Sequence, residues 1–283
     1  MMILPINFFP LKRLLAIVLM LSFSQQVIAA LEENQSVENQ SVKSQLVENQ
    51  LVENQSIENQ LVESQPTKKQ CTRHANYDIY LSGIHTGTMK RAENWQGKSA
   101  VVTSTSKASI LGIGTQYDQR AELSWSDTTE EWITERFHQL VTGFRARDMK
   151  VSLSKDGLES EVDIDGDIDR YKSAHIPLRD VDTLAIQMRQ LLMQGRSQFA
   201  LVRQASDDIE PYQLYVKPTI KATIEPWGEM KLIPVEQSGA EEVTYYFAPD
   251  MDYQLVRARY HGFILQGVIE LNEYNSTCER LTQ

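Results

Sequence analysis

The sequence predicts an all-β domain that spans residues 71–283 and carries one amphipathic helix. Three observations support this prediction. From Cys71 onward, short runs rich in β-branched and aromatic residues alternate with turn signals. One stretch, residues 180–195, instead has its apolar residues at helical spacing. The only two cysteines of the chain, Cys71 and Cys278, bracket nearly all of this region.

Residues 1–30 are predicted to be a secretory signal peptide. Two basic residues precede the apolar run of residues 14–23, and small residues follow up to Ala30. This is the order of basic region, apolar core and cleavage site found in signal peptides. The apolar run is shorter than the ~20 residues that a membrane-spanning helix needs, although an uncleaved membrane anchor is the alternative. We therefore expect export to the periplasm and no transmembrane segment in the mature form.

Residues 31–70 consist of eight five-residue units such as LVENQ, and every unit ends in glutamine. Five residues advance a helix by about 500°, so the apolar positions collect on no single face. On a strand, an odd period moves them to the opposite face at each repeat. The low-complexity repeat has no aromatic residue and no glycine, so apolar burial would not offset the entropy of ordering. We expect a disordered spacer, with a short β-solenoid as the alternative.

The folded domain opens with a predicted pair of strands at residues 76–93, around a glycine-containing turn. Two further turns, at residues 155–157 and 165–167, divide the region from 149 to 171 into strands. The remaining strand-like runs cover residues 98–110, 115–126, 130–143, 197–204, 213–237, 241–250 and 255–274. The sequence thus predicts about a dozen strands.

The helix is expected at residues 180–195. Asp180 can cap its N-terminus, and Gly195 can terminate it. One stripe of this helix contains the apolar residues Val181, Leu184, Ala185, Met188, Leu191 and Leu192. Such a stripe is more often part of the core than a binding face, so we expect the helix to pack on the sheet.

Cys71 and Cys278 are predicted to form a disulfide bond. An exported protein folds in an oxidising compartment, where a pair of cysteines usually becomes linked. Closing a loop of this length stabilises the fold by up to ~5 kcal/mol. Two free thiols are the alternative. Neither cysteine belongs to a CxxC motif, so redox catalysis is not expected.

Three stretches resemble a bacterial exported family known as domain of unknown function 3108 (DUF3108). They are YDIYLSGIHTGTMK near the start of the domain, DVDTLAIQMRQLLMQG at the helix and EVTYYFAPDMDYQLVRARYHGFILQGVIELNEY near the end. The resemblance covers about residues 71–275. Gln254 stands where the family often has proline, and Thr183 replaces the usual serine. The resemblance implies a mainly antiparallel curved sheet, an open half-barrel, with the helix on its concave side. It implies no catalytic residues.

The acidic run EVDIDGDIDR, residues 161–170, is the strongest candidate for a metal site. Read as an EF-hand loop, it has glycine at the sixth position but Lys172 at the twelfth, where a glutamate is required. Read as a hairpin with a three-residue loop, it places Asp163 opposite Asp169, a like-charge pair. We predict a solvated turn and no metal. Weak Ca²⁺ binding is the alternative, and its candidate ligands are Asp163, Asp165, Asp167 and Asp169.

No constellation of catalytic residues is evident. The five histidines are scattered singly, and no zinc or nucleophile motif is present. The acidic residues Asp250 and Asp252 lie beside a proline, as is typical of a turn. Together with His261 they are the residues to test if the protein is an enzyme. We predict a non-enzyme without a cofactor.

The net charge of −10 disfavours nucleic acid as a partner. We expect a periplasmic protein that binds a lipid or an acyl chain in a groove of the sheet. A module of envelope assembly or protein interaction is the alternative, and a hydrolase is the least favoured interpretation. Besides the helix stripe, the residues that support a hydrophobic groove are the aromatic Trp125, Trp132, Tyr245, Tyr246 and Phe247.

Overall fold

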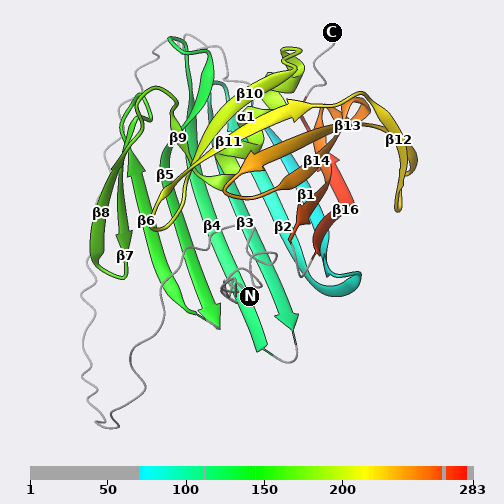
Figure 1. The fold of residues 1–283 in the computed structure, drawn as a ribbon, viewed down its shortest axis with the longest axis horizontal. Coiled ribbons are helices and arrows are strands. Elements are labelled where there is room, and N and C mark those ends of the chain that lie inside the picture. The colour runs from blue at the N-terminus through cyan, green and yellow to red at the C-terminus, as the bar shows by residue number, and fades with distance from the viewer. Residues whose placement is uncertain (1–69, 111–112, 144, 263–265, 279–283) are drawn as a thin grey trace, which may run out of the picture. The chain divides into compact units, whose positions relative to one another are not determined.

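The computed structural model describes residues 70–110, 113–143, 145–262 and 266–278. The predicted signal peptide and all of the repeat spacer except Gln70 lie outside the described residues. The described part forms one 16-stranded sheet with a single α-helix, α1 (Figure 1). The prediction of a mainly antiparallel curved sheet with one amphipathic helix is therefore confirmed.

The first half of the sheet is a meander in which each strand pairs antiparallel with the next. Its strands alternate buried and exposed side chains, because one face packs on the core. The strands are β1 (Gln70–Leu81), β2 (Ile84–Gln96), β3 (Ser99–Ile110), β4 (Ile113–Ser126), β5 (Glu131–Gly143), β6 (Arg147–Leu153), β7 (Glu159–Ile164) and β8 (Asp167–Lys172).

The second half begins with the helix and returns to β1. Its elements are β9 (Leu178–Arg179), α1 (Val181–Met193), β10 (Gln198–Gln204), β11 (Ile209–Val216), β12 (Ile220–Ile224), β13 (Gly228–Gly239), β14 (Val243–Ala248), the short 3-10 helix η2 (Pro249–Met251), β15 (Gln254–His261) and β16 (Gln266–Ser276). The single run expected at residues 213–237 contains parts of three strands. This is one reason why the sheet has more strands than predicted.

The two ends of the domain meet in the middle of the sheet. β1 pairs antiparallel with β16. The disulfide between Cys71 of β1 and Cys278, two residues beyond β16, has a Cα–Cα distance of 4.8 Å. This predicted bond is confirmed. The outermost strands are β8 and β9, which pair with β7 and β10 but not with each other in the part of the chain that the structure describes. The sheet is thus curved but unclosed, and residues 173–177 connect its two edges along the chain.

α1 begins and ends as predicted. The side chain of Asp180 accepts hydrogen bonds from the backbone N–H groups of Asp182 (2.7 Å) and Thr183 (3.1 Å), which satisfies two donors of the first turn. At the other end Gly195 has a φ of 72°. The backbone N–H of Arg196 donates to the carbonyl of Leu191, as expected of a left-handed C-terminal cap.

α1 lies inside the curve of the sheet and contacts both of its halves (Figure 1). Ile186 packs with buried residues of β3 to β7. The predicted apolar stripe, including Leu184, Met188, Leu191 and Leu192, packs with residues of β10, β11, β13 and β14. The helix is therefore part of the core. Among the described residues, no helix has both the length and the apolar composition to cross a membrane.

The predicted register of the acidic hairpin is wrong. Its loop has two residues, Asp165 and Gly166, with φ angles of 54° and 100°, so Asp163 faces Ile168 rather than Asp169. An Asp-Gly pair favours such a tight turn, because both positions need a positive φ and this backbone twist matches that of the strands. The like-charge pair that the three-residue loop would create is absent from these two described strands.

Candidate ligand-binding site

A cavity of about 100 Å³ lies between α1 and the sheet. Its apolar lining comes from Ile79, Met89, Leu184, Ala185, Met188, Phe247, Leu255, Ala258 and Ile269. Its polar lining comes from Tyr77, Arg91, Glu93, Ser104, Ser106, Asp182, Arg189, Tyr245 and Gln254. A cavity of ~150 Å³ lined by apolar residues can bind benzene, so this space suits a small molecule or a short stretch of alkyl chain.

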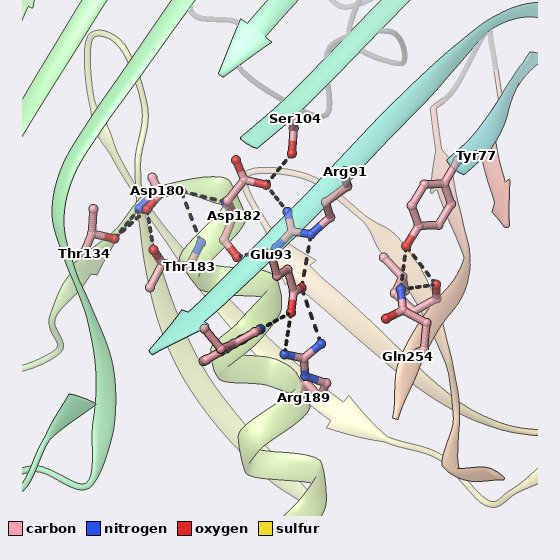
Figure 2. Close-up of polar contacts among 12 residues, drawn as sticks. Tyr77, Arg91, Glu93, Ser104, Thr134, Asp180, Asp182, Thr183, Arg189 and Gln254 are labelled. Atoms are coloured by element: carbon pink, nitrogen blue, oxygen red, sulfur yellow. Dashed lines mark hydrogen bonds and ion pairs between the residues drawn. The ribbon is translucent and has the colours of Figure 1, made fainter. Parts of the chain in front are cut away.

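Two strand residues and two helix residues form a charged cluster at the cavity (Figure 2). Arg91 and Glu93 lie two residues apart on β2 and therefore share one face of the strand. Asp182 and Arg189 lie seven residues apart on α1 and share one face of the helix. Together these four residues make up the charged part of the cavity lining.

Ion pairs connect the cluster into a chain from one element to the other. Arg91 pairs with Asp182 and, at 3.3 Å, with Glu93. Arg189 donates to both carboxylate oxygens of Glu93, at 2.9 and 3.4 Å. The indole N–H of Trp95 donates to the same carboxylate at 3.1 Å. The chain of charges thus attaches α1 to β2.

The charged side chains are 2–11% exposed, so their charges depend on one another. Burial alone would raise the pKa of Glu93, but the guanidinium groups of Arg189 and Arg91 lower that pKa to about 2. Burial would lower the pKa of Arg91, yet Asp182 and Glu93 raise it. Glu93 and Arg91 therefore both stay ionised at neutral pH.

Asp182 uses only one of its two carboxylate oxygens in these contacts. Its Oδ1 accepts from Ser104 Oγ at 3.0 Å and pairs with Arg91. Its Oδ2 is buried and has no hydrogen-bond partner among the described residues. The Oγ of Ser106, two residues along β3, is in the same situation. Buried polar atoms of native proteins are usually hydrogen-bonded, so this end of the cavity has unused bonding capacity.

Asp180 fixes the start of α1 just outside the cavity lining. Besides capping the helix, its Oδ2 accepts from the hydroxyl groups of Thr183 (2.5 Å) and Thr134 (2.6 Å). Burial and the neighbouring charge of Asp182 raise the pKa of Asp180, although these hydrogen bonds oppose the shift. The carboxyl group of Asp180 is fully used and positions Asp182 rather than a ligand.

A second polar group closes the cavity on the side of β1 and β15. Gln254 Nε2 donates to Tyr77 Oη at 2.8 Å, and Tyr77 donates to the carbonyl of Leu255 at 3.0 Å. Burial raises the pKa of Tyr77, so this phenol stays neutral. The amide of Gln254 thus joins β15 to β1.

The five aromatic residues that the sequence analysis assigned to a hydrophobic groove lie in three different parts of the structure. Tyr245 and Phe247 line the cavity. Trp132 makes edge contacts with Trp95 and Trp125, at centroid distances of 5.0 and 5.3 Å, beside the core cluster of β3 to β7. Tyr246 packs in a different apolar cluster. Two of the five aromatic residues therefore belong to the candidate site.

The candidate metal ligands do not form a site. An oxygen of Asp163 accepts from the N–H of Gly166 at 2.8 Å, and one of Asp165 accepts from the N–H of Asp148 at 2.9 Å. Asp167 and Asp169 lie exposed on β8. Within the described ranges, no group of three or more His, Cys, Asp or Glu residues could hold a metal ion.

The residues considered for catalysis are not brought together. Asp250 is exposed, Asp252 forms an ion pair with Arg73, and His261 Nε2 lies 2.8 Å from Thr244 Oγ1. Asp252 precedes the start of β15 and His261 is its last residue, and the strand spans about 25 Å. They cannot serve one reaction centre.

Arg91, Glu93, Asp182 and Arg189 were not expected at the site. One signal was available in the sequence. Residues 89, 91, 93 and 95 share one face of β2. Met89 and Trp95 suggest that this face points toward the core, so the charged Arg91 and Glu93 between them are unusual. The contact with α1 involves residues 96 positions apart, and no local pattern predicts it.

Comparisons with known proteins reveal the fold alone. No family model matches the chain, and no curated protein matches it. One similar solved structure is the β-barrel-like protein of domain of unknown function DUF1849 from Brucella abortus, with 10% sequence identity and a TM-score of 0.51. The match covers 72% of this chain and 97% of that chain. It supports a β-barrel-like domain of unknown function and does not bear on DUF3108.

Proposed function

We propose that this protein is a non-enzymatic binding protein of the periplasm that holds a hydrophobic ligand between α1 and the sheet. The observation that carries the proposal is the cavity itself. It combines an apolar wall with buried polar atoms that lack partners among the described residues. Ligand sites are typically concave and mostly apolar, with a few polar groups that fix orientation.

The cavity favours binding over catalysis. The residues that line it include neither histidine nor cysteine. Ser104 donates to Asp182 Oδ1, but that carboxylate is held in an ion pair with Arg91, and no histidine among the described residues of the cavity accompanies the pair. A nucleophile, a base and an orienting group are therefore not assembled in the described lining.

The size of the cavity limits what it encloses. With about 100 Å³, it can surround a short alkyl segment but not a whole lipid. A lipid or acyl ligand would insert one end, and the rest of the molecule would lie outside. Leu184, Ala185 and Met188 of α1 would contact the inserted chain from one side, because they line the cavity.

The proposed location rests on two features. The first is the N-terminal pattern of a signal peptide. The second is the disulfide Cys71–Cys278, because such bonds persist in oxidising compartments. Membership of DUF3108 is part of the same proposal, supported by the quoted stretches at residues 71–275. Fractionation of the producing cells tests the location, and recovery of the protein in the cytoplasm would contradict it.

An eight-carbon ligand, octanol or octanoate, tests the binding proposal by its effect on the melting temperature. At ten times its Kd, a ligand stabilises a protein by about 1.4 kcal/mol, or roughly 3–5 °C for a domain of this size. Ala185→Phe fills the cavity and should abolish the shift. Ala92→Phe places the same side chain on β2 outside the lining and should retain it. Equal responses of the two variants would contradict the proposal.

Protein interaction is the second candidate, and one observation favours it. β8 is an edge strand, and its Ile168 is 54% exposed. Such an edge can accept a strand from a partner. Crosslinking in intact cells would then give an adduct that Ile168→Lys reduces. Recovery of monomer alone would contradict this alternative.

A further inference from the structure

The polar end of the cavity contains two atoms that lack a partner in the described part of the chain. Asp182 is 2% exposed and Ser106 is 3% exposed, and neither Asp182 Oδ2 nor Ser106 Oγ is hydrogen-bonded there. Leaving such an atom unsatisfied costs roughly 1–3 kcal/mol. Both residues line the cavity, so a molecule in the cavity is placed to supply the missing bonds.

The two atoms belong to one small region. Ser104 donates to the Oδ1 of Asp182, and Ser106 lies two residues further along the same face of β3. Two residues span about 7 Å along a strand. The polar head group of a ligand at this end of the cavity therefore lies near both Asp182 and Ser106.

The charge of the cavity lining is already balanced. Arg91 and Arg189 supply two positive charges, and Glu93 and Asp182 supply two negative charges. Two of the three phenols of the lining, those of Tyr77 and Tyr245, stay neutral because burial raises the pKa of each. Any charged group that enters would have no counter-charge of its own, and a buried unpaired charge costs several kcal/mol.

The chemistry of the free atoms restricts the ligand further. Asp182 Oδ2 is a carboxylate oxygen and can only accept a hydrogen bond, whereas the Ser106 hydroxyl can donate. A ligand carboxylate would bring its own lone pairs against Asp182. A ligand ammonium could donate to Asp182 but would lie close to Arg91, which pairs with that same carboxylate. A hydroxyl group satisfies both atoms without adding charge.

We infer that the cavity binds an uncharged amphiphile with a hydroxyl head group, of the class of fatty alcohols and monoacylglycerols. The ligand O–H donates to Asp182 Oδ2, and the ligand oxygen accepts from Ser106 Oγ. The alkyl chain lies against Ile79, Leu184, Met188 and Phe247, which form part of the apolar lining. This assignment of a ligand class rests on the proposed function, since it concerns the same cavity.

Three ligands of equal chain length test the head group: 1-octanol, octanoate and octylammonium, each titrated at pH 7 by calorimetry onto the full mature protein. Octanol should bind at least tenfold more tightly than either ion. Octanoate binding as tightly as octanol would overturn the inference and leave the proposed function intact. Failure of all three to bind would overturn both.

A substitution at Asp182 tests which side chain sets the preference for an uncharged ligand. Asp182→Asn can present a donor where the carboxylate oxygen was, and it removes a negative charge beside Arg91. The ratio of the octanol and octanoate affinities should therefore fall at least tenfold. An unchanged ratio would contradict the assigned role of Asp182.

A matched pair of serine variants on β3 provides a test that does not depend on the folding of the Asp182 variant. Ser106→Ala should weaken octanol binding three- to tenfold, because one hydrogen bond to the ligand is lost. Ser109→Ala, at an exposed position on the opposite face of the same strand, should leave the affinity unchanged. Equal effects of the two substitutions would contradict the inference.

Discussion

Charged residues are used in two opposite ways in this domain. In the β7–β8 hairpin, Arg170 pairs with Glu161 at 2.6 Å, and the two side chains are 75% and 42% exposed. Between β2 and α1, Arg189 pairs with Glu93 at a similar 2.9 Å, but the side chains are 8% and 6% exposed. Nearly the same distance therefore describes two different interactions, because water screens the first and is excluded from the second.

The two groups also differ in what they connect. The hairpin pair joins adjacent strands that the turn already holds together. The buried pair joins residues 96 positions apart and attaches the helix to the sheet beside the cavity. We conclude that the buried cluster positions α1 over the candidate site, whereas the hairpin charges mainly keep an edge strand soluble.

The largest expected difference between the buried and the exposed ion pair is the free energy of unfolding that is lost when the carboxylate of the pair is removed. Glu93→Gln removes the charge that Arg91 and Arg189 share, and breaking a buried pair in this way costs about 3–5 kcal/mol. Glu161→Gln removes an exposed partner and should cost less than about 1 kcal/mol. Chemical denaturation measures both. Similar losses in the two variants would remove the distinction drawn here.

The pH dependence of stability sharpens the comparison. The pKa of Glu93 is lowered from 4.5 to about 2 on folding, so its contribution is complete above pH 4.5 and is lost as the pH falls toward 2. The difference corresponds to roughly 3 kcal/mol. The pKa of Asp180 is raised by burial. Asp180 is present in both the wild type and Glu93→Gln, so its effect on stability cancels in the difference between the two proteins. The difference between the two proteins should therefore shrink between pH 4.5 and 2, and a constant difference would contradict the assignment.

A smaller contrast is expected between two aspartates that each bond to backbone N–H groups. Asp180→Ala removes the buried cap of α1 and its bonds to Thr134 and Thr183, at a cost of about 1–2 kcal/mol. Asp163→Ala removes one bond to Gly166 in an exposed turn and should cost about 0.5 kcal/mol. Thermal unfolding of both variants measures this, and a larger effect at Asp163 would reverse the ranking.

The smallest expected effect concerns calcium. Because the acidic side chains of the hairpin bond to backbone groups or are exposed, millimolar Ca²⁺ should shift the melting temperature by less than about 1 °C. Mg²⁺ at equal ionic strength is the control. A shift specific to Ca²⁺ that disappears in Asp165→Asn would show that the hairpin is a site after all.

Local chemistry made much of the fold predictable. Asp180 and Gly195 marked the ends of α1, since a capping carboxylate and a left-handed glycine act within one turn. The Ser82-Gly83 turn similarly ends β1 and begins β2. The hairpin register was missed although the Asp165-Gly166 pair favours a two-residue turn. The expected three-residue loop included Asp167, which instead begins β8.

The site was less predictable because it depends on contacts between distant residues. Tyr245 and Phe247 were identified from their aromatic character alone. The pairing of Arg91 with Asp182 depends on where α1 rests on the sheet, and that position results from packing against both halves of the sheet. The volume left between the side chains is also a product of all these contacts. No single segment of the sequence encodes it.

The central claim is that the cavity under α1 holds an uncharged amphiphile. Native mass spectrometry of the protein, purified gently from its own host, tests this claim most directly. We predict a fraction of the protein with a small neutral hydroxyl-bearing molecule, which is absent from Ala185→Phe prepared in the same way. A wild-type protein that shows only the mass of the bare chain, under conditions that preserve such complexes, would contradict the claim.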